Sequence, residues 1–146
     1  AKVAFDLDVC HPGSHDAYLM SADILFFNEL GFNVYRGEEA YDDTVKRLLG
    51  AGVSILVVTL GENGCRVHTK DGVSTVPGIH VDAVDVTGAG DTFCSSFLYA
   101  LSESGGDLMY AAQFANAAAS RAVTIFGPRG GVADKDTVLQ FLQQNQ

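Results

Sequence analysis

The sequence predicts an α/β protein in which helices cover both faces of a doubly wound, mostly parallel sheet. Short apolar segments with strand character alternate with helical patterns, and residues 54–60 form a continuous apolar run. Runs of this kind are typical of central parallel strands that are buried on both faces. A third observation, the glycine-rich turn at residues 88–90 before an apolar helical pattern, indicates a ligand site at a helix start.

Composition and charge narrow the class of protein. The chain has 146 residues, 47% of them hydrophobic, which is enough for one compact α/β domain over residues 1–146 with its own core. The net charge of −9 argues against nucleic acid or an anionic membrane as a partner. No apolar run approaches the ~20 residues that span a bilayer. The three scattered cysteines favour a reducing compartment, so we expect a cytoplasmic protein.

The N-terminal third contains two short apolar segments. Residues 3–7 and 22–27 are expected to be buried strands, the first of which ends among acids. Asp6 and Asp8 lie where the carboxyl end of a parallel strand delivers groups to a ligand. Asn28 and Glu29 follow the second apolar segment directly.

The middle of the chain predicts a helix, a central strand and a hairpin. Residues 38–49 have apolar positions at helical spacing, and residues 54–60 are the central strand. Residues 61–64, Gly-Glu-Asn-Gly, follow at the carboxyl end of that strand, where open α/β sheets bind ligands. The same four residues are also compatible with a tight Asn-Gly turn into a hairpin formed by residues 64–69 and 73–76.

Three helices are predicted in the C-terminal part. The first runs over residues 90–102, and Asp107 is a suitable N-cap for an alanine-rich helix that includes residues 111–122. Asn116 interrupts that apolar stretch, and its amide needs partners, either an adenine edge or a neighbouring backbone. Asp134 is expected to cap a last amphipathic helix.

The turn at residues 88–91 carries the chemistry. Gly88, Ala89 and Gly90 can direct their amides the same way at a helix start, which favours an anion. Asp91 would repel a phosphate there unless it takes a proton from a nearby hydroxyl, as a general base does. The alternative is an ordinary helix start with an acid that favours the dipole. A Walker A loop is excluded because no lysine follows, and the dinucleotide fingerprint fails at Phe93.

Longer strings extend this interpretation. Residues 85–93, DVTGAGDTF, resemble the second signature of the ribokinase (PfkB) family of carbohydrate kinases. Residues 59–64, TLGENG, are similar to the nucleotide loop of that family, and residues 116–130, NAAASRAVTIFGPRG, to its C-terminal nucleotide and cation segment. The three stretches occur in the family's order, so the resemblance covers most of the chain.

The resemblance implies the ribokinase-like fold and ATP-dependent phosphorylation of a hydroxyl on a sugar or sugar-like molecule. Asp91 would be the general base, Gly88, Ala89 and Gly90 the anion hole, and Mg²⁺ would arrive with ATP. The residues that would contact the nucleotide are Asn28, Thr59, Gly61, Asn63, Gly64, Asn116 and Gly127. The residues that would hold a potassium ion are Asp85, Thr87, Val123 and Phe126.

The chain departs from the family pattern in two respects. The family has Asn-x-x-Glu at a place where this chain has Asn28 and Gly31, so the acid that helps to organise magnesium is missing. Glu29 either replaces it or is a solvated acid at a helix start. The chain also corresponds to the C-terminal half of the family, so we expect the substrate and lid half, through which a homodimer would form, to be absent. A nucleoside kinase of the same fold and a nucleotide-binding piece without turnover of its own are the alternatives.

Overall fold

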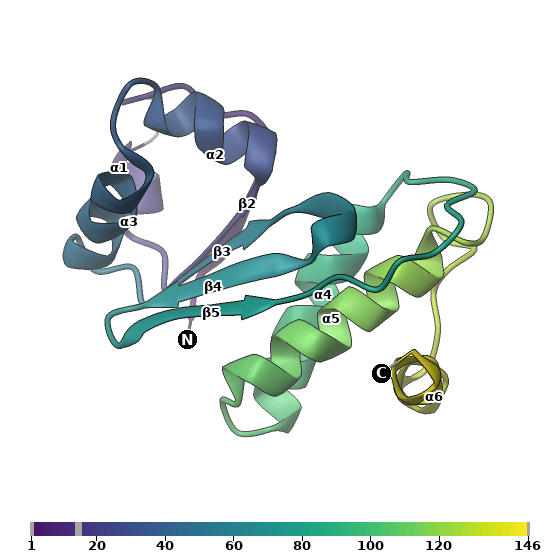
Figure 1. The fold of residues 1–146 in the computed structure, drawn as a ribbon. Helices are drawn as coiled ribbons and strands as arrows, with labels where there is room; N and C mark the ends of the chain where they lie inside the picture. The colour runs from purple at the N-terminus through teal and green to yellow at the C-terminus, as the bar shows by residue number, and fades with distance from the viewer. Residues whose placement is uncertain (1, 14–15, 146) are drawn as a thin grey trace. The chain divides into compact units, whose positions relative to one another are not determined.

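The computed structural model describes residues 2–13 and 16–145. The chain divides into two compact units, the first comprising Ala1–Gly61 with Arg66–Thr75 and the second Glu62–Cys65 with Val76–Gln146. Figure 1 shows the elements of both units in the colours of the chain. That the two units act as one domain stays a prediction.

The sheet has five strands in the order β1-β2-β3-β4-β5 among the described residues. The strands are β1 (Ala4–Leu7), β2 (Ile24–Asn28), β3 (Ile55–Thr59), β4 (Cys65–Thr69) and β5 (Gly72–Val76). β2 pairs in parallel with both β1 and β3. The connections from β3 to β4 and from β4 to β5 are too short for a parallel crossover, so these pairs are antiparallel. The predicted strands and hairpin are therefore present, and most of the sheet is built around the parallel β2. The expected burial of the first strand is wrong, because in the described part of the chain β1 pairs with β2 alone and its Ala4 and Asp6 are exposed.

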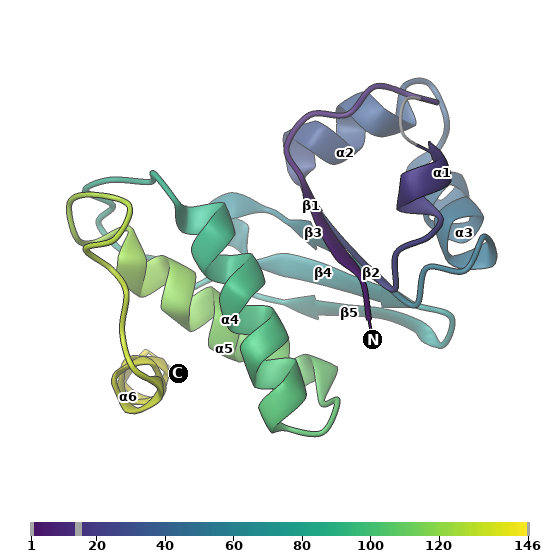
Figure 2. The same cartoon turned by 180° about the vertical axis from the view of Figure 1, so that it is seen from behind.

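Helices α2 (Glu29–Arg36) and α3 (Tyr41–Gly50) pack against β2 and β3 (Figures 1 and 2). Phe27 of β2 contacts Phe32 of α2 edge to face, with ring centroids 5.4 Å apart, and Leu48 of α3 belongs to the same core. α3 was predicted and the short α1 (Asp16–Leu19) was not, whereas for α2 only a helix start at Glu29 was considered. A glycine at position 31 weakens the helical propensity of α2, and burial of its apolar face on the sheet compensates.

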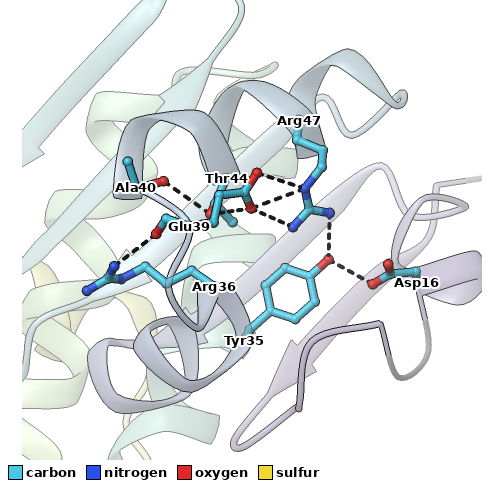
Figure 3. Close-up of polar contacts among 7 residues, drawn as sticks. All are labelled: Asp16, Tyr35, Arg36, Glu39, Ala40, Thr44 and Arg47. Atoms are coloured by element: carbon cyan, nitrogen blue, oxygen red, sulfur yellow. Dashed lines mark hydrogen bonds and ion pairs between the residues drawn. The ribbon is translucent and has the colours of Figure 1, made fainter.

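Polar side chains connect α1, α2 and α3 (Figure 3). We call Asp16, Tyr35, Glu39, Thr44 and Arg47 the α2–α3 polar cluster. The Tyr35 hydroxyl donates to Asp16 Oδ1 at 2.9 Å and accepts from Arg47 Nη1 at 3.2 Å. Arg47 Nη2 lies 2.9 Å from Glu39 Oε2, and the Thr44 hydroxyl donates to the same oxygen at 2.7 Å. These bonds hold α1, α2 and α3 in one arrangement.

The second unit consists mainly of helices α4 (Ala89–Glu103), α5 (Leu108–Ala122) and α6 (Lys135–Gln144). α5 packs against both α4 and α6. The predicted caps are confirmed, because Asp107 Oδ1 accepts from the Tyr110 amide at 3.0 Å and Asp134 Oδ1 from the Thr137 amide at 2.8 Å. In the part of the chain that the structure describes, none of the helices combines the length and apolar character needed to cross a bilayer.

Candidate active site

The glycine turn lies directly before α4. Gly88 is the N-cap of this helix and has φ 78°, in the left-handed region that side chains rarely adopt. A Cβ at this position would also lie 3.3 Å from the Cβ of Pro128, so Pro128 closes one side of the turn. Asp91 is exposed in the first turn of α4. The backbone conformation is therefore fixed at Gly88, while the carboxylate of Asp91, in the first turn of the helix, faces solvent.

The amides of the turn differ in what they bond. The Ala89 amide donates to the Val86 carbonyl at 3.2 Å, and the Thr92 amide donates to the Gly88 carbonyl at 2.9 Å as the helix begins. An anion that used all three amides of the predicted anion hole would have to compete with Val86 for that of Ala89. The helix dipole favours negative charge at this end of α4.

Asp85 joins the turn to the segment after α5. Its Oδ1 accepts from the Thr87 amide at 3.0 Å and its Oδ2 from the Gly127 amide at 2.9 Å. The hydrogen bonds from Thr87, followed by that from Gly127, lower the pKa of the Asp85 carboxyl, so the group is held as a carboxylate. The amides of Val84 and Asp85 both donate to the Val123 carbonyl, at 2.7 and 3.1 Å. The two stretches that were predicted to hold potassium thus lie side by side.

The oxygens at this junction suit a monovalent cation only in part. A carboxylate and a backbone carbonyl are the right kind of donor for a hard cation, and Asp85 and Val123 supply both. The Val123 carbonyl already accepts two amides, which matches its two lone pairs. Potassium would need Val123 to exchange at least one of these hydrogen bonds for the ion. Phe126 is 81% exposed, so its side chain adds no packing there.

The predicted nucleotide loop forms a short 3-10 helix, η1 (Gly61–Asn63), rather than a two-residue Asn-Gly turn. Gly64 follows with φ 95°, and a Cβ there would overlap the carbonyl oxygen of Val76. A Cβ at Gly78 would likewise overlap the carbonyl of Glu62. Residues 62–64 and 76–78 therefore pack backbone to backbone, which only glycine allows at these two positions.

Asn116 holds the same segment from the side of α5. Its side chain is 6% exposed, and Nδ2 donates to the carbonyls of Val76 at 3.4 Å and Pro77 at 3.1 Å. Of the two kinds of partner expected for this amide, the structure provides the neighbouring backbone. Asn116 thus positions the strand end that lies against Gly64. Sequence reasoning missed Gly78 and gave Pro128 no role of its own within the loop after α5, although the Pro-Gly and Gly-Pro pairs that contain them are recognisable turn signals.

In the first unit, the remaining candidates lie at the carboxyl ends of parallel strands. Asn28 closes β2 and pairs in register with Thr59, which closes β3, and Gly61 follows with φ 59°. Asn28 caps α2, since its Oδ1 accepts from the Gly31 amide at 2.6 Å, and its Nδ2 donates to Asp8 Oδ1 at 2.9 Å. The candidates thus form one group in the first unit and a second group around α4, α5 and residues 62–64 in the second.

Comparison with known proteins connects these groups to one family. The sequence model described as pfkB family carbohydrate kinase matches residues 5–135. The chain is 46% identical to probable fructokinase-5 of Arabidopsis thaliana over 88 residues, which are 56% of this chain and 27% of that protein. It is 38% identical to ribokinase of Bacillus subtilis (strain 168) over 99 residues, 68% of this chain and 33% of that protein.

Solved structures show the same fold. An Arabidopsis thaliana ribokinase complexed with ribose and ATP has a TM-score of 0.81 at 31% identity, over 94% of this chain and 47% of its own. An E. coli protein assigned as a ribokinase II, in complex with ATP and Mg²⁺, has a TM-score of 0.82 at 27% identity, over 88% and 41%. A Vibrio cholerae fructokinase double mutant with fructose, ADP and potassium has a TM-score of 0.79 at 27% identity, over 86% and 42%.

These matches establish the fold of the chain and show how much of each known protein it covers. The chain has the ribokinase-like fold, with a mostly parallel sheet flanked by helices. It spans about a third or less of the two curated relatives and less than half of each of these three solved structures. Because the family model covers residues 5–135, including every residue of the glycine turn, the chain belongs to the pfkB family of carbohydrate kinases.

Proposed function

We propose that this chain is the nucleotide-binding and catalytic part of an ATP-dependent kinase that phosphorylates a hydroxyl of a sugar or sugar-like small molecule. The observation that carries the proposal is the turn before α4. Gly88 in a left-handed conformation starts the helix, and Asp91 is exposed one helical turn from the N-cap. Backbone amides that favour an anion and a carboxylate that is open to a hydroxyl are the two groups that phosphoryl transfer to an alcohol requires.

In this proposal, Asp91 removes the proton from the substrate hydroxyl. Amides of the turn, from Gly88 to Gly90, stabilise the charge on the transferring phosphoryl group, as an oxyanion hole does. The bond from Asp85 to the Gly127 amide supports this role, because it ties the turn to the loop after α5 and keeps its backbone in place. Preorganised donors need little rearrangement when charge develops, although the Ala89 amide would first have to release the Val86 carbonyl.

The nucleotide would lie against two sets of residues. Thr59, Gly61, Asn63 and Gly64 contribute the strand end and the η1 loop, which the close approach of residues 62–64 to residues 76–78 holds in shape. Asn116 supports this shape through the backbone of residues 76–77. Magnesium that arrives with ATP would supply positive charge to the phosphate oxygens. Carboxylate and amide oxygens at the ends of β1 and β2 are donors of the type that Mg²⁺ prefers.

Potassium would occupy the junction of Asp85 and Val123. We expect the whole enzyme to be faster in potassium than in sodium, because Asp85 and Thr87 come directly before the predicted anion hole, so an ion held there would order its amides. Initial rates in matched chloride salts measure the effect, with Asp85→Asn as the variant that should lose it. Equal rates of the unsubstituted enzyme in the two salts would remove the ion from the proposal.

Binding and turnover need separate tests, because the chain spans less than half of the solved structures compared. We expect the chain itself to bind ATP with Mg²⁺, more weakly than the whole protein. Titration calorimetry measures this affinity, and circular dichroism confirms that the sample is folded. A folded chain that gives no heat with ATP would contradict the nucleotide site. A phosphorylation screen of the whole protein against sugars and nucleosides then identifies the acceptor, and turnover of nucleosides alone would overturn the sugar assignment.

A further inference from the structure

Three polar side chains share one edge of the parallel part of the sheet. Leu7 of β1 pairs with Phe27 of β2, so Asp8 follows β1 at the level at which Asn28 closes β2. Asn28 in turn pairs with Thr59, the last residue of β3. The carboxyl ends of parallel strands are where open α/β sheets bind ligands. Asp8, exposed to solvent, is the carboxylate at this edge that contacts Asn28.

Asn28 fixes the position of that carboxylate. Its Oδ1 is used by the amide of Gly31 and its Nδ2 by Asp8 Oδ1, at 2.6 and 2.9 Å. Both ends of the Asn28 amide are therefore committed, and its orientation is set by the start of α2. Asp8 accepts this bond with one oxygen. An ionised carboxylate is an acceptor at both oxygens, so the second one is available to a cation or a water bound to it.

Gly31 explains why the acid comes from residue 8. A Cβ at position 31 would overlap the carbonyl oxygen of Asp8 and would lie 3.2 Å from Asn28 Oδ1. With this backbone, no side chain fits at position 31, because the chain after β1 occupies that space. An acid at position 31 is therefore sterically incompatible with the observed position of residue 8. The sequence has glycine at position 31, which fits.

We propose that Asp8 supplies the carboxylate that faces the nucleotide-bound magnesium, in place of an acid at position 31. The inference rests on the proposed function, since it takes the nucleotide to bind at the carboxyl ends of these strands. Magnesium bound with a nucleotide needs only one or two carboxylates besides the phosphates, so a single acid is sufficient. Glu29 is the rival. It is exposed in the first turn of α2, whereas Asp8 bonds to Asn28 directly.

The experiment compares the gain in nucleotide affinity that magnesium produces. Titration calorimetry of the 146-residue chain with ADP, once in EDTA and once in excess Mg²⁺, gives this gain. Asp8→Asn keeps an oxygen that accepts from Asn28 and removes only the charge. We expect it to reduce the magnesium-dependent gain by about tenfold or more, the effect of losing a group that supports a metal, with the affinity in EDTA unchanged. Glu29→Gln tests the rival and should retain the gain, as should the matched control Asp71→Asn, at an exposed acid in the turn between β4 and β5.

A second measurement uses the unsubstituted chain. Mn²⁺ added with ADP should broaden the NMR amide signals of residues 7–9 before those of Glu29 and of α3, because a paramagnetic ion at Asp8 relaxes its neighbours first. Broadening centred on α3 would overturn the inference. The inference would also be overturned if Glu29→Gln lost the magnesium-dependent gain and Asp8→Asn kept it. In that case, ADP would still bind, and the proposed function would stand. Absence of ADP binding by the folded, unsubstituted chain would overturn both.

Discussion

The α2–α3 polar cluster and the turn before α4 use polar residues in opposite ways. In the cluster, side chains bind one another: Tyr35 is 1% exposed and its hydroxyl has partners in Asp16 and Arg47 (Figure 3). Burial is the main cause that raises the pKa of Tyr35, so the hydroxyl stays protonated and can donate. The hydrogen bonds of this cluster hold the helices together.

In the turn before α4, by contrast, a side chain binds the backbone. Asp85 accepts amides of Thr87 and Gly127, and Gly88 takes a conformation that side chains disfavour. The carboxylate of Asp91 is left exposed at the end of this arrangement. We therefore expect substitutions in the α2–α3 polar cluster to change only the stability of the fold. Substitutions in the turn should change the rate of catalysis or the backbone conformation that supports it.

The largest expected effect separates catalysis from stability at Asp91. Asp91→Asn in the whole protein should reduce kcat by about 10²–10⁴, or roughly 3–5 kcal/mol of transition-state stabilisation, with the affinity for ATP retained. Asp136→Asn is the matched control, because Asp136 is an exposed acid in the first turn of α6. If Asp91 only favoured the dipole, both substitutions would cost about 0.3–1 kcal/mol of stability and leave the rate nearly intact. Steady-state kinetics and ATP calorimetry on both variants distinguish the two outcomes.

The second effect concerns the backbone of the turn. Gly88→Ala should lower the free energy of unfolding by about 1–2 kcal/mol, because alanine is disfavoured at φ 78° and Pro128 lies close to the added Cβ. Gly90→Ala is the control, since nothing lies within 4 Å of a Cβ there and alanine is the better helix former. Urea unfolding of the chain measures both. Equal losses in the two variants would mean that the left-handed conformation at Gly88 does not matter.

A smaller loss is expected in the α2–α3 polar cluster. Tyr35→Phe removes the hydroxyl that joins Asp16 to Arg47, while Arg47 keeps its bonds to Glu39. The expected cost is about 1 kcal/mol, the net value of such hydrogen bonds, with no change in ATP affinity. Tyr99→Phe, at a tyrosine that is 44% exposed, is the control and should cost less. A change in ATP affinity in Tyr35→Phe would show that the cluster reaches the site and would break the contrast between the two regions.

The smallest expected effect is a pH dependence at His68. Burial, and then the charge of Arg66, lower the pKa of His68 from its usual 6.5, against a smaller opposite effect of Asp42. The folded state therefore takes up the proton less readily than the unfolded state. This contribution to stability is complete above pH 6.5 and declines as the pH falls below that value. His68 accepts or donates a bond with the Tyr41 hydroxyl at 3.0 Å.

Urea midpoints at pH 7.5 and 5.5 measure this effect in the unsubstituted chain and in His68→Gln. The variant should show a smaller drop between the two pH values, because the group that resists protonation is gone. His80→Gln, at an exposed histidine for which no such burial applies, is the control and should keep the original drop. A drop that is the same in all three proteins would assign the acid sensitivity to other groups.

The sequence by itself determined the features whose causes are local. The apolar run of β3 and the N-caps Asp107 and Asp134 are decided within a few residues, since each cap bonds an amide three positions ahead. The glycine turn before α4 was recognisable for the same reason, as was the order of the three family-like stretches. Local sequence was sufficient there because chain geometry alone brings the interacting groups together.

Only the tertiary structure decided the interactions between distant residues. α2 depends on burial of Phe32 and Tyr35 against the sheet, which its own propensity does not reveal. Asn116 finds its acceptors about 40 residues away along the chain, and Asp85 bonds to an amide 42 residues away. Whether position 31 could carry an acid was likewise fixed by the carbonyl of Asp8, because steric exclusion depends on which chain segments the fold places in contact.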